Sequence, residues 1–292
     1  MNGRFSFPAL FVAAAIIQCS LLGCSIREDR EGCPSVLKLN LADAWSMASK
    51  YGIDEMILFV DDGTSVCQRV LKSGESEVRI IVQRGDIDID VYGIEGASAG
   101  SFPSGKLWKI SGAAGEESEP GGFFGECGGV YGLEGKPFPP LWRFSGNAVV
   151  SGECTAVDVR LHKDYCRMTV AVTDEDDRTW YPYGMTFRSS ADGVSPGGAV
   201  SRGELIFSLS PGYDRKAYAT VPRQDDGSLV LELSSSDGIL RTFPIGEYII
   251  ASGYDWDAVD LEDIELDVDF SMTRIKVGFT GWDKTYTFLV EI

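Results

Sequence analysis

Residues 56–71, MILFVDDGTSVCQRVL, set the fold class of this 292-residue chain. An apolar run, Met56 to Val60, leads into Asp61-Asp62-Gly63, and a second segment with apolar residues follows from Val66 to Leu71. Two short segments of this kind on either side of an Asp-Gly turn signal predict a β-hairpin. The hairpin indicates that the chain folds as antiparallel sheet.

Strand-like segments recur on both sides of this hairpin. Leu37 to Leu41 and Val157 to Leu161 alternate apolar and polar residues, and such a period of two buries one face of a strand. Helical periodicity is scarce, and Ala42 to Tyr51 is the best candidate for a helix or an irregular insert. Further strands are predicted at residues 78–82, 86–91, 168–172, 184–187, 204–209, 217–221, 229–233, 248–251, 264–270, 274–279 and 286–292.

The strands form two series, separated by a stretch of different composition. Residues 95–147 are rich in Gly, Ser, Pro and Glu, which favours long loops with few short strands. A second series begins near Ala156. Many short strands at this spacing are typical of antiparallel sandwiches, and a hydrophobic content of 44% can fill two cores. We therefore predict an all-β chain with two tandem antiparallel β-sandwich domains, residues 35–155 and 156–292.

The first 23 residues have the build of a secretory signal peptide. Arg4 is the only charged side chain before Cys24, and it precedes an uninterrupted apolar run from Ala9 to Ile17. This run is about half of the ~20 residues that a membrane-spanning helix needs. We predict that residues 1–23 are a signal peptide and that the mature chain begins at Cys24.

The end of this segment, Leu21-Leu22-Gly23-Cys24, resembles a bacterial lipobox. In a lipobox, a small residue before the cysteine admits the lipoprotein signal peptidase, and the cysteine thiol carries a diacylglyceryl group. Each buried methylene contributes ~0.8 kcal/mol, so a multiply acylated cysteine holds a protein on a membrane. The alternative is an ordinary signal peptide in which Cys24 merely lies near the cut. Cys19 fits a lipobox less well because the bulky Gln18 precedes it.

Residues 24–34 are short, polar and charged, and we expect them to be a lipidated tether. Glu28, Asp29 and Glu31 resemble the acidic export signal that follows the lipidated cysteine in surface lipoproteins of some Gram-negative anaerobes, which implies the outer face of the cell outer membrane. A solvated tether explains the same acids equally well. The net charge of −18 repels nucleic acid and anionic headgroups, so no nucleic-acid partner is expected and the lipid must hold the protein to the membrane.

Five cysteines remain after removal of Cys19 and acylation of Cys24. An exported chain meets an oxidising compartment, so one or two disulfides are expected, but the spacings leave the pairing open. No Cys-x-x-Cys or Cys/His cluster with zinc spacing occurs in the sequence, and we expect no metal and no cofactor. The five are Cys33, Cys67, Cys127, Cys154 and Cys166.

A family resemblance covers nearly the whole mature chain. Cys33-Pro34 closes the tether, Ile57 to Gly63 forms the first strand and turn, and Val157 to Leu161 opens the second half. In this order, and together with the lipobox, these segments resemble the FimB-type fimbrial anchor lipoproteins. The resemblance continues in the closing segments Phe243 to Tyr248, Asp255-Trp256, Leu261 to Asp269 and Gly281-Trp282.

The resemblance implies two transthyretin-like β-sandwich domains and a non-enzymatic protein that anchors or assembles a fimbrial fibre at the cell surface. It also implies a partner, a fimbrial stalk subunit bound by β-strand addition. Related stalk subunits lose a propeptide strand after a basic residue. Arg27 and Arg30 offer such bonds, but Ser25 to Gly32 is too polar to have filled a hydrophobic groove, which favours a permanently lipidated anchor. The apolar period-two end, Tyr286 to Ile292, is expected to be the chain's own last strand, with a donor strand as the alternative.

Acidic residues alternate with apolar ones on two predicted strands. On a strand these carboxylates share the solvent face, where they keep sheets from pairing edge to edge. A calcium site is the alternative, although the spacing and central glycine of an EF-hand are missing. The acids are Asp86, Asp88 and Asp90 in one strand and Glu265, Asp267 and Asp269 in the other.

Catalytic motifs are missing from the sequence, and we expect no catalytic residue. His162 is the only histidine, and a lone histidine is more often structural. Among the tryptophans, Trp256 and Trp282 lie among predicted strands, between one strand and the next, and are expected in the core. Trp142 and Trp180 lie in loop-like surroundings and are predicted as exposed contacts. The alternative function is therefore a surface adhesin or glycan-binding lipoprotein, or a tip subunit of the same fimbrial family.

Overall fold

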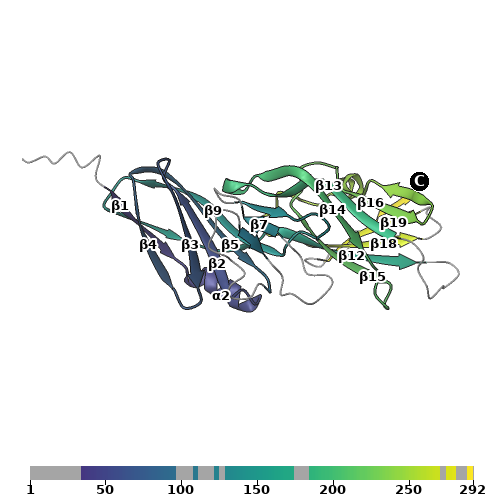
Figure 1. Ribbon diagram of the computed structural model, residues 1–292, viewed down its shortest axis with the longest axis horizontal. Coiled ribbons are helices and arrows are strands. Elements are labelled where there is room, and N and C mark those ends of the chain that lie inside the picture. The colour runs from purple at the N-terminus through teal and green to yellow at the C-terminus, as the bar shows by residue number, and fades with distance from the viewer. Residues whose placement is uncertain are drawn as a thin grey trace, which may run out of the picture.

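The computed structural model describes residues 34–96, 108–110, 122–124, 129–173, 184–269, 274–280 and 288–291. These residues form two β-sandwiches that lie end to end, the first in purple and blue at the left of Figure 1 and the second in green and yellow at the right. The prediction of an all-β fold with sandwich domains is confirmed. In the described part of the chain, no helix has both the length and the apolar character that crossing a bilayer requires.

The elements of the first half begin with β1 (Ser35–Asn40), α2 (Ala42–Lys50), β2 (Glu55–Asp61), β3 (Val66–Lys72), β4 (Glu77–Val82) and β5 (Gly85–Ile94). They continue with β6 (Trp108–Ile110), β7 (Gly122–Phe124), β8 (Val130–Gly132), β9 (Leu141–Val150), β10 (Cys154–Asp158) and β11 (His162–Lys163).

The second half contains β12 (Tyr165–Thr173), β13 (Gly184–Val194), the short 3-10 turn η2 (Pro196–Gly198), β14 (Val200–Leu209), β15 (Lys216–Pro222) and β16 (Val230–Ser235). It closes with β17 (Gly238–Phe243), α3 (Ile245–Ala251), β18 (Asp263–Asp269), β19 (Arg274–Thr280) and β20 (Phe288–Glu291).

The first sandwich packs a three-stranded sheet, in the order β10-β1-β4, against a five-stranded sheet, in the order β11-β9-β5-β2-β3. Alternation places Leu37 and Leu39 of β1 in the core. The predicted hairpin is confirmed as β2 and β3, and Gly63 supplies the positive φ of 73° in the turn between them. The predicted helix is confirmed as α2, which buries Ala44 and Ala48 against the core.

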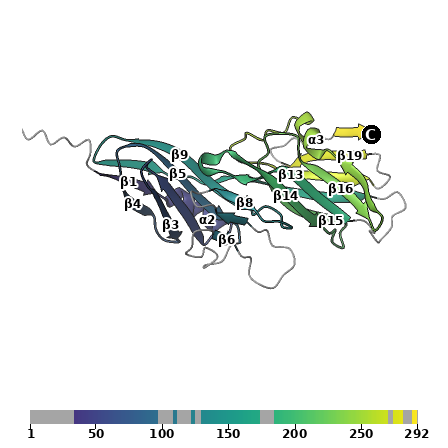
Figure 2. The same ribbon diagram turned by 45° about the horizontal axis from the view of Figure 1, so that its top comes forward.

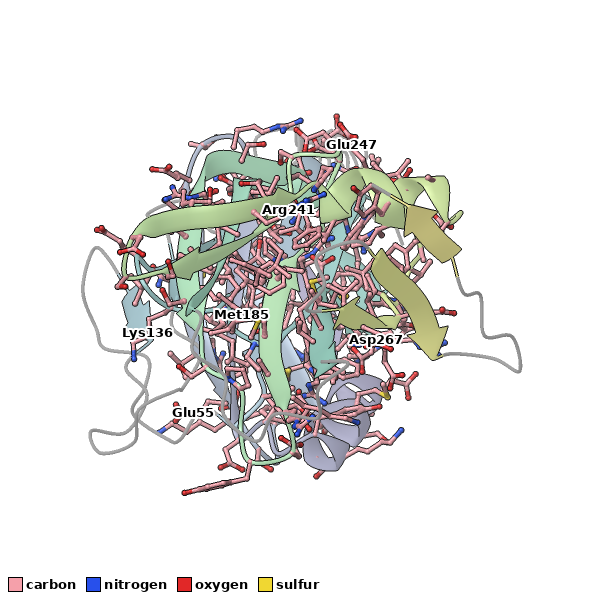
Figure 3. The ribbon with its side chains drawn as sticks, turned by 90° about the vertical axis from the view of Figure 1, so that its right-hand side faces the viewer. Glu55, Lys136, Met185, Arg241, Glu247 and Asp267 are labelled. Atoms are coloured by element: carbon pink, nitrogen blue, oxygen red, sulfur yellow. The ribbon has the colours of Figure 1, made fainter. Side chains whose placement is uncertain are left out.

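The second sandwich packs a five-stranded sheet, β15-β12-β18-β19-β20, against a larger sheet in the order β17-β16-β13-β8-β7-β6, with β14 also paired to β13. Figure 3 looks along the long axis and shows Met185 of β13 in the interior between the sheets, where it is fully buried.

A ribbon from the first half of the sequence completes this larger sheet. β8 pairs with the end of β13, where Val130 lies opposite Val194, and β7 and β6 extend the sheet beyond it. In Figure 2, β6 and β8 lie near the middle of the molecule, between the purple strands and the green ones. A Cβ on Gly193 would lie 2.1 Å from the carbonyl oxygen of Val130, so this close approach requires glycine.

The strand that was predicted to open the second domain belongs instead to the first sandwich. β10 pairs in parallel with β1, so that Val36 lies opposite Cys154. The predicted boundary at residue 155 falls inside this strand, and the two sets of sheets divide between β11 and β12. Alternation in the sequence identifies a strand but carries no information on which distant strand it will pair with.

Two other local predictions were wrong, and a strand was missed. The region predicted as mostly loop contains the ten-residue strand β9. Its pairing with β5 stabilises the strand, although Gly146 in its middle disfavours one. Residues 248–251 were predicted as a strand but belong to α3, because Ile245 and Ile249 are buried at the i, i+4 spacing of a helix. β17 was not predicted at all.

Candidate functional site

The predicted anchoring residues lie outside the described part of the chain. The same holds for Cys33, Cys127, Trp180 and Trp282. Cys67, Cys154 and Cys166 carry free thiols, and burial raises the pKa of Cys166 to about 12. The anchoring residues are Leu21, Leu22, Gly23 and Cys24 of the lipobox, Arg27 and Arg30, and the acids Glu28, Asp29 and Glu31.

Pro34, the first residue that the structure describes, leads directly into β1. β1 is the middle strand of the three-stranded sheet and is bonded to β10 from one end to the other. At the start, the N–H of Val36 donates to the carbonyl of Glu153 at 3.0 Å. At the far end, the N–H of Val159 donates to the carbonyl of Asn40 at 3.0 Å, and the Asn40 amide donates to Asp158 Oδ1 at 2.6 Å.

Trp142 was predicted as an exposed contact, and this prediction was wrong. The side chain is only 2% exposed, and its ring stacks on Tyr51 with 4.0 Å between the ring centroids. Tyr51 follows α2 directly, so the helix covers the face of β9 that carries Trp142. The prediction that Trp256 lies in the core is confirmed, since it is 7% exposed and packs edge to face against Tyr254.

The acidic strand β5 is solvated only at its start. Asp86 and Asp88 are exposed as predicted, but Asp90 is 4% exposed, which corrects the prediction for that residue. Asp90 accepts hydrogen bonds from the Ser145 hydroxyl and, at 3.0 Å, from the N–H of Gly197. Asp90 is buried because the turn η2 of the second sandwich covers β5 at this residue. On β18, Glu265 is exposed and Asp267 is half-buried, while the Asp269 side chain lies outside the described set.

A buried ionic network lies where the chain passes from one sandwich to the other. Asp164, between β11 and β12, is 1% exposed. One of its carboxylate oxygens accepts from Arg143 Nε of β9 at 2.7 Å, and the other accepts from Arg223, just after β15, at 2.9 Å. Arg143 also donates to Ser145 Oγ at 2.6 Å, which joins Asp90 to the network. One carboxylate thus connects strands of both sandwiches, and removing one member of such a buried group costs about 3–5 kcal/mol.

The turn η2 closes over this network and requires glycine. Gly197 and Gly198 have φ values of +73° and +87°, a region that residues with a Cβ rarely adopt. A Cβ on Gly198 would lie 1.8 Å from Arg143 Nη1. The turn therefore packs directly on the guanidinium of Arg143 and shields it from solvent.

A second polar contact lies nearby. The hydroxyl of Tyr165, at the start of β12, donates to Glu95 Oε2 at 2.5 Å, and Arg167 lies 3.4 Å from the same carboxylate. Burial, together with Glu95, raises the pKa of Tyr165, so the phenol stays protonated and acts as a donor. Glu95 follows β5 of the first sandwich, so this contact also links the two bodies.

Two shallow hollows open beside the network, with volumes of about 190 and 140 Å³. Both are lined by Asp88, Asp90 and Gly197, and the larger also by Ser145 and Asn147. Among the described residues, no group of three His, Cys, Asp or Glu side chains is placed to hold a metal ion. These polar groups are engaged with one another, and their arrangement connects the two sandwiches.

Sequence reasoning did not identify the members of this network. Arg143 and Asp164 are 21 residues apart, and Asp164 and Arg223 are 59 apart, so no motif spacing joins them. One local signal was available: Arg143 lies between Trp142 and Phe144 inside an apolar strand, where a charged residue needs a buried partner.

The exposed edges of the sheets are the other candidate sites for binding. Within the described residues, β10 and β4 are the edges of the first small sheet, and β3 and β15 are edges of the two five-stranded sheets. An edge strand presents unpaired backbone groups that can accept a further strand. His162, the lone histidine, lies on the short edge strand β11 with its Nδ1 3.5 Å from Asp260 Oδ2.

No family model and no curated protein matches this sequence. Several solved structures match its fold. A fimbrial anchor protein from Porphyromonas gingivalis matches with a TM-score of 0.53 at 13% identity, over 88% of this chain and 100% of its own. A candidate polysaccharide-binding protein from Bacteroides thetaiotaomicron matches with a TM-score of 0.55 at 13% identity, over 89% of this chain and 98% of its own. A candidate adhesin from the same organism matches with a TM-score of 0.53 at 14% identity, over 87% and 98%. The chain therefore shares its fold, over almost its whole length, with a fimbrial anchor protein and with adhesin-type proteins.

Proposed function

We propose that this protein is a lipid-anchored component of the cell surface that holds a fimbrial fibre at its base. The observation that carries the proposal is the shared fold with a fimbrial anchor protein, which extends over 100% of that protein and 88% of this chain. The lipobox at residues 21–24 supports it independently, because it supplies the membrane attachment that an anchor needs.

The proposed location is the outer membrane, with the acyl chains on Cys24 in the lipid and both sandwiches outside it. Residues 24–34 form the tether, and Glu28, Asp29 and Glu31 direct the protein to the outer face. The strongly acidic chain, with a net charge of −18, gains nothing from anionic headgroups, so attachment depends on the lipid.

The proposed partner is a fimbrial stalk subunit, bound by β-strand addition to an exposed sheet edge. Backbone hydrogen bonds supply the affinity in this mode, and alternate side chains supply the specificity. No reaction is involved in the proposal: the polar groups that the structure brings together at Asp164 are paired with one another and link the two sandwiches.

The test compares two cysteines of the leader in the producing cell. Cys24→Ala should release fimbriae and this protein into the medium, because the acylated residue is lost. Cys19→Ala is the matched control and should leave both on the cells, since Gln18 precedes it. Fibres that stay attached in the Cys24→Ala strain would refute the anchoring role. Mass spectrometry of the mature N-terminus should find Cys24 acylated.

A second function, glycan binding at the cell surface, is favoured by the matches to a candidate polysaccharide-binding protein and a candidate adhesin. Trp180 remains the predicted contact for a sugar ring, since Trp142 is buried. A glycan array with the purified protein separates the two functions. Binding that Trp180→Ala abolishes would support the adhesin, whereas co-purification of a stalk subunit from membranes, with no glycan bound, would support the anchor.

A further inference from the structure

β1 and β10, which come first and last along the chain among the strands of the three-stranded sheet, run parallel and side by side. Val36 to Asn40 of β1 lie opposite Cys154 to Asp158 of β10, one residue against one. The chain enters this sandwich at the beginning of β1, at the left-hand end in Figure 1, and passes toward the second sandwich from the end of β10. Between β10 and the second sandwich, β11 adds the two register pairs His162–Arg143 and Lys163–Trp142, and the side-chain contacts of Asp164 and Glu95 join the two sandwiches.

We propose that the β1–β10 ladder is a tension clamp that carries load between the membrane and the second sandwich. The inference rests on the proposed function, in which a lipid on Cys24 pulls the beginning of β1 and the fibre pulls the second sandwich. These pulls act at opposite ends of two parallel strands and along their axes. The ladder is then loaded in shear, and its bonds must break together, whereas an antiparallel hairpin pulled at its open end breaks them one at a time.

Contacts at both ends of the ladder fit this role. The bond from Val36 N–H to Glu153 closes the end that the lipid would pull. At the other end, Asn40 accepts from Val159 N–H through its carbonyl and donates to Asp158 through its side chain. The strands are therefore tied at both ends as well as along the register.

β1 is also held on its other edge and in the core. It pairs antiparallel with β4 over six residues, and Lys38 Nζ lies 2.6 Å from Glu77 Oε2 across that pair. Leu37 and Leu39 are fully buried. Sliding β1 by one residue would turn these leucines to the solvent, because strand side chains alternate with a period of two. Slow slippage under load is thus opposed by the core.

Force spectroscopy on the mature chain, residues 24–292, tests the clamp with handles at the two termini. Val36→Pro removes the N–H that donates to Glu153 and should lower the rupture force of one unfolding peak by about half. Ile81→Pro is the matched control. Ile81 lies opposite Val36 in an edge strand, and since the N–H of Val36 points to β10, the N–H of Ile81 points away from β1. This control should leave every peak within about a tenth of the wild-type force.

A second loading direction keeps the test decisive if Val36→Pro fails to fold. Handles at the N-terminus and in the β2–β3 turn, at Gly63-Thr64, pull on β1 without pulling on the end of β10, so the ladder is no longer sheared between its two ends. The first sandwich should then open at a clearly lower force than in the end-to-end geometry. Equal forces in the two geometries, or equal peaks for Val36→Pro and Ile81→Pro, would overturn the clamp. Neither outcome depends on where the protein is anchored, which the Cys24→Ala strain tests separately.

Discussion

The backbone N–H of Gly197 donates to the buried carboxylate of Asp90 at 3.0 Å, across 107 positions of the sequence and from the second sandwich to the first. The contact is one of several by which the turn η2 and the network around Asp164 hold the two sandwiches together. The carboxylates of Asp90 and Asp164 are 4% and 1% exposed, and removing a hydrogen-bond donor from either one leaves a polar atom unpaired and out of water.

Removal of the central carboxylate should destabilise the protein strongly. Asp164→Ala leaves the guanidiniums of Arg143 and Arg223 without their shared partner, and we expect a loss of about 3–5 kcal/mol in the free energy of unfolding. Glu75→Ala is the control, since it removes a carboxylate from an exposed pair with Arg69 at 2.9 Å and should cost at most about 1 kcal/mol. Urea unfolding at pH 7 measures both, and similar losses would contradict a structural role for the network.

Gly198 should be less tolerant of a methyl group than a glycine with the same backbone conformation. Gly198→Ala meets both a φ of +87° and the guanidinium of Arg143. Gly253→Ala meets only the conformational penalty, since Gly253 has a φ of +85° and nothing lies within 4 Å of a Cβ there. We expect about 1 kcal/mol for the control and about 1–3 kcal/mol more for Gly198→Ala. Equal thermal shifts in the two variants would show that the turn does not pack on Arg143.

Trp142 should contribute to stability and not to ligand binding. Trp142→Ala empties a buried site beneath Tyr51 and should lower the free energy of unfolding by about 3–5 kcal/mol. Trp142→Phe keeps the stack and should cost far less. Any binding to cells, fibres or glycans should be unchanged in Trp142→Phe, and a selective loss of binding in this folded variant would restore Trp142 as a contact residue.

The carboxylate of Asp62 should make stability depend on pH. The N–H of Gln83 donates to it at 3.0 Å, those of Ser65 and Thr64 add to the effect, and together they hold the pKa of Asp62 below its usual value. A lowered folded-state pKa means that the stabilisation is complete above the unfolded-state pKa of about 4 and is lost as the pH falls through the lower folded-state value.

Asp62→Asn should therefore be less stable than wild type at pH 6–8, and the difference should shrink below about pH 4. The free energy of unfolding, measured by urea titration across this range, gives the comparison. Asp86→Asn, which changes an exposed acid on β5, is the control and should follow the wild-type curve. A difference between Asp62→Asn and wild type that persists unchanged at acid pH would contradict this assignment.

The local pattern of apolar, polar and turn-forming residues was sufficient to predict most strands and the first hairpin. Met56 to Val60 and the turn at Gly63 carry the hairpin in their own residues, and α2 emerges where alternation stops. β10 shows the limit of such reasoning. Val157 marks a strand by its neighbours, but its pairing with Leu39 depends on a chain segment more than a hundred residues earlier. Register between distant strands is a property of the assembled core.

The same distinction separates the predicted from the unpredicted site residues. Asp88 and Asp90 have the same alternating pattern in the sequence, yet only Asp88 is exposed. The turn at Gly197 decides the difference, and nothing near Asp90 in the sequence announces it. Trp142 was misassigned for the same reason: the flanking prolines suggested a loop, whereas β9 pairs with β5 and Tyr51 covers the ring.

The ribbon β6–β8 limits which parts of two related chains can be exchanged by recombination. Its residues are translated with the first sandwich but fill the edge of β13 in the second. A recombination event that exchanges everything after β11 would separate β13 from the segment that evolved against it, including the tight crossing at Gly193. Viable hybrids between chains of this architecture should therefore inherit residues 108–132 together with the C-terminal half.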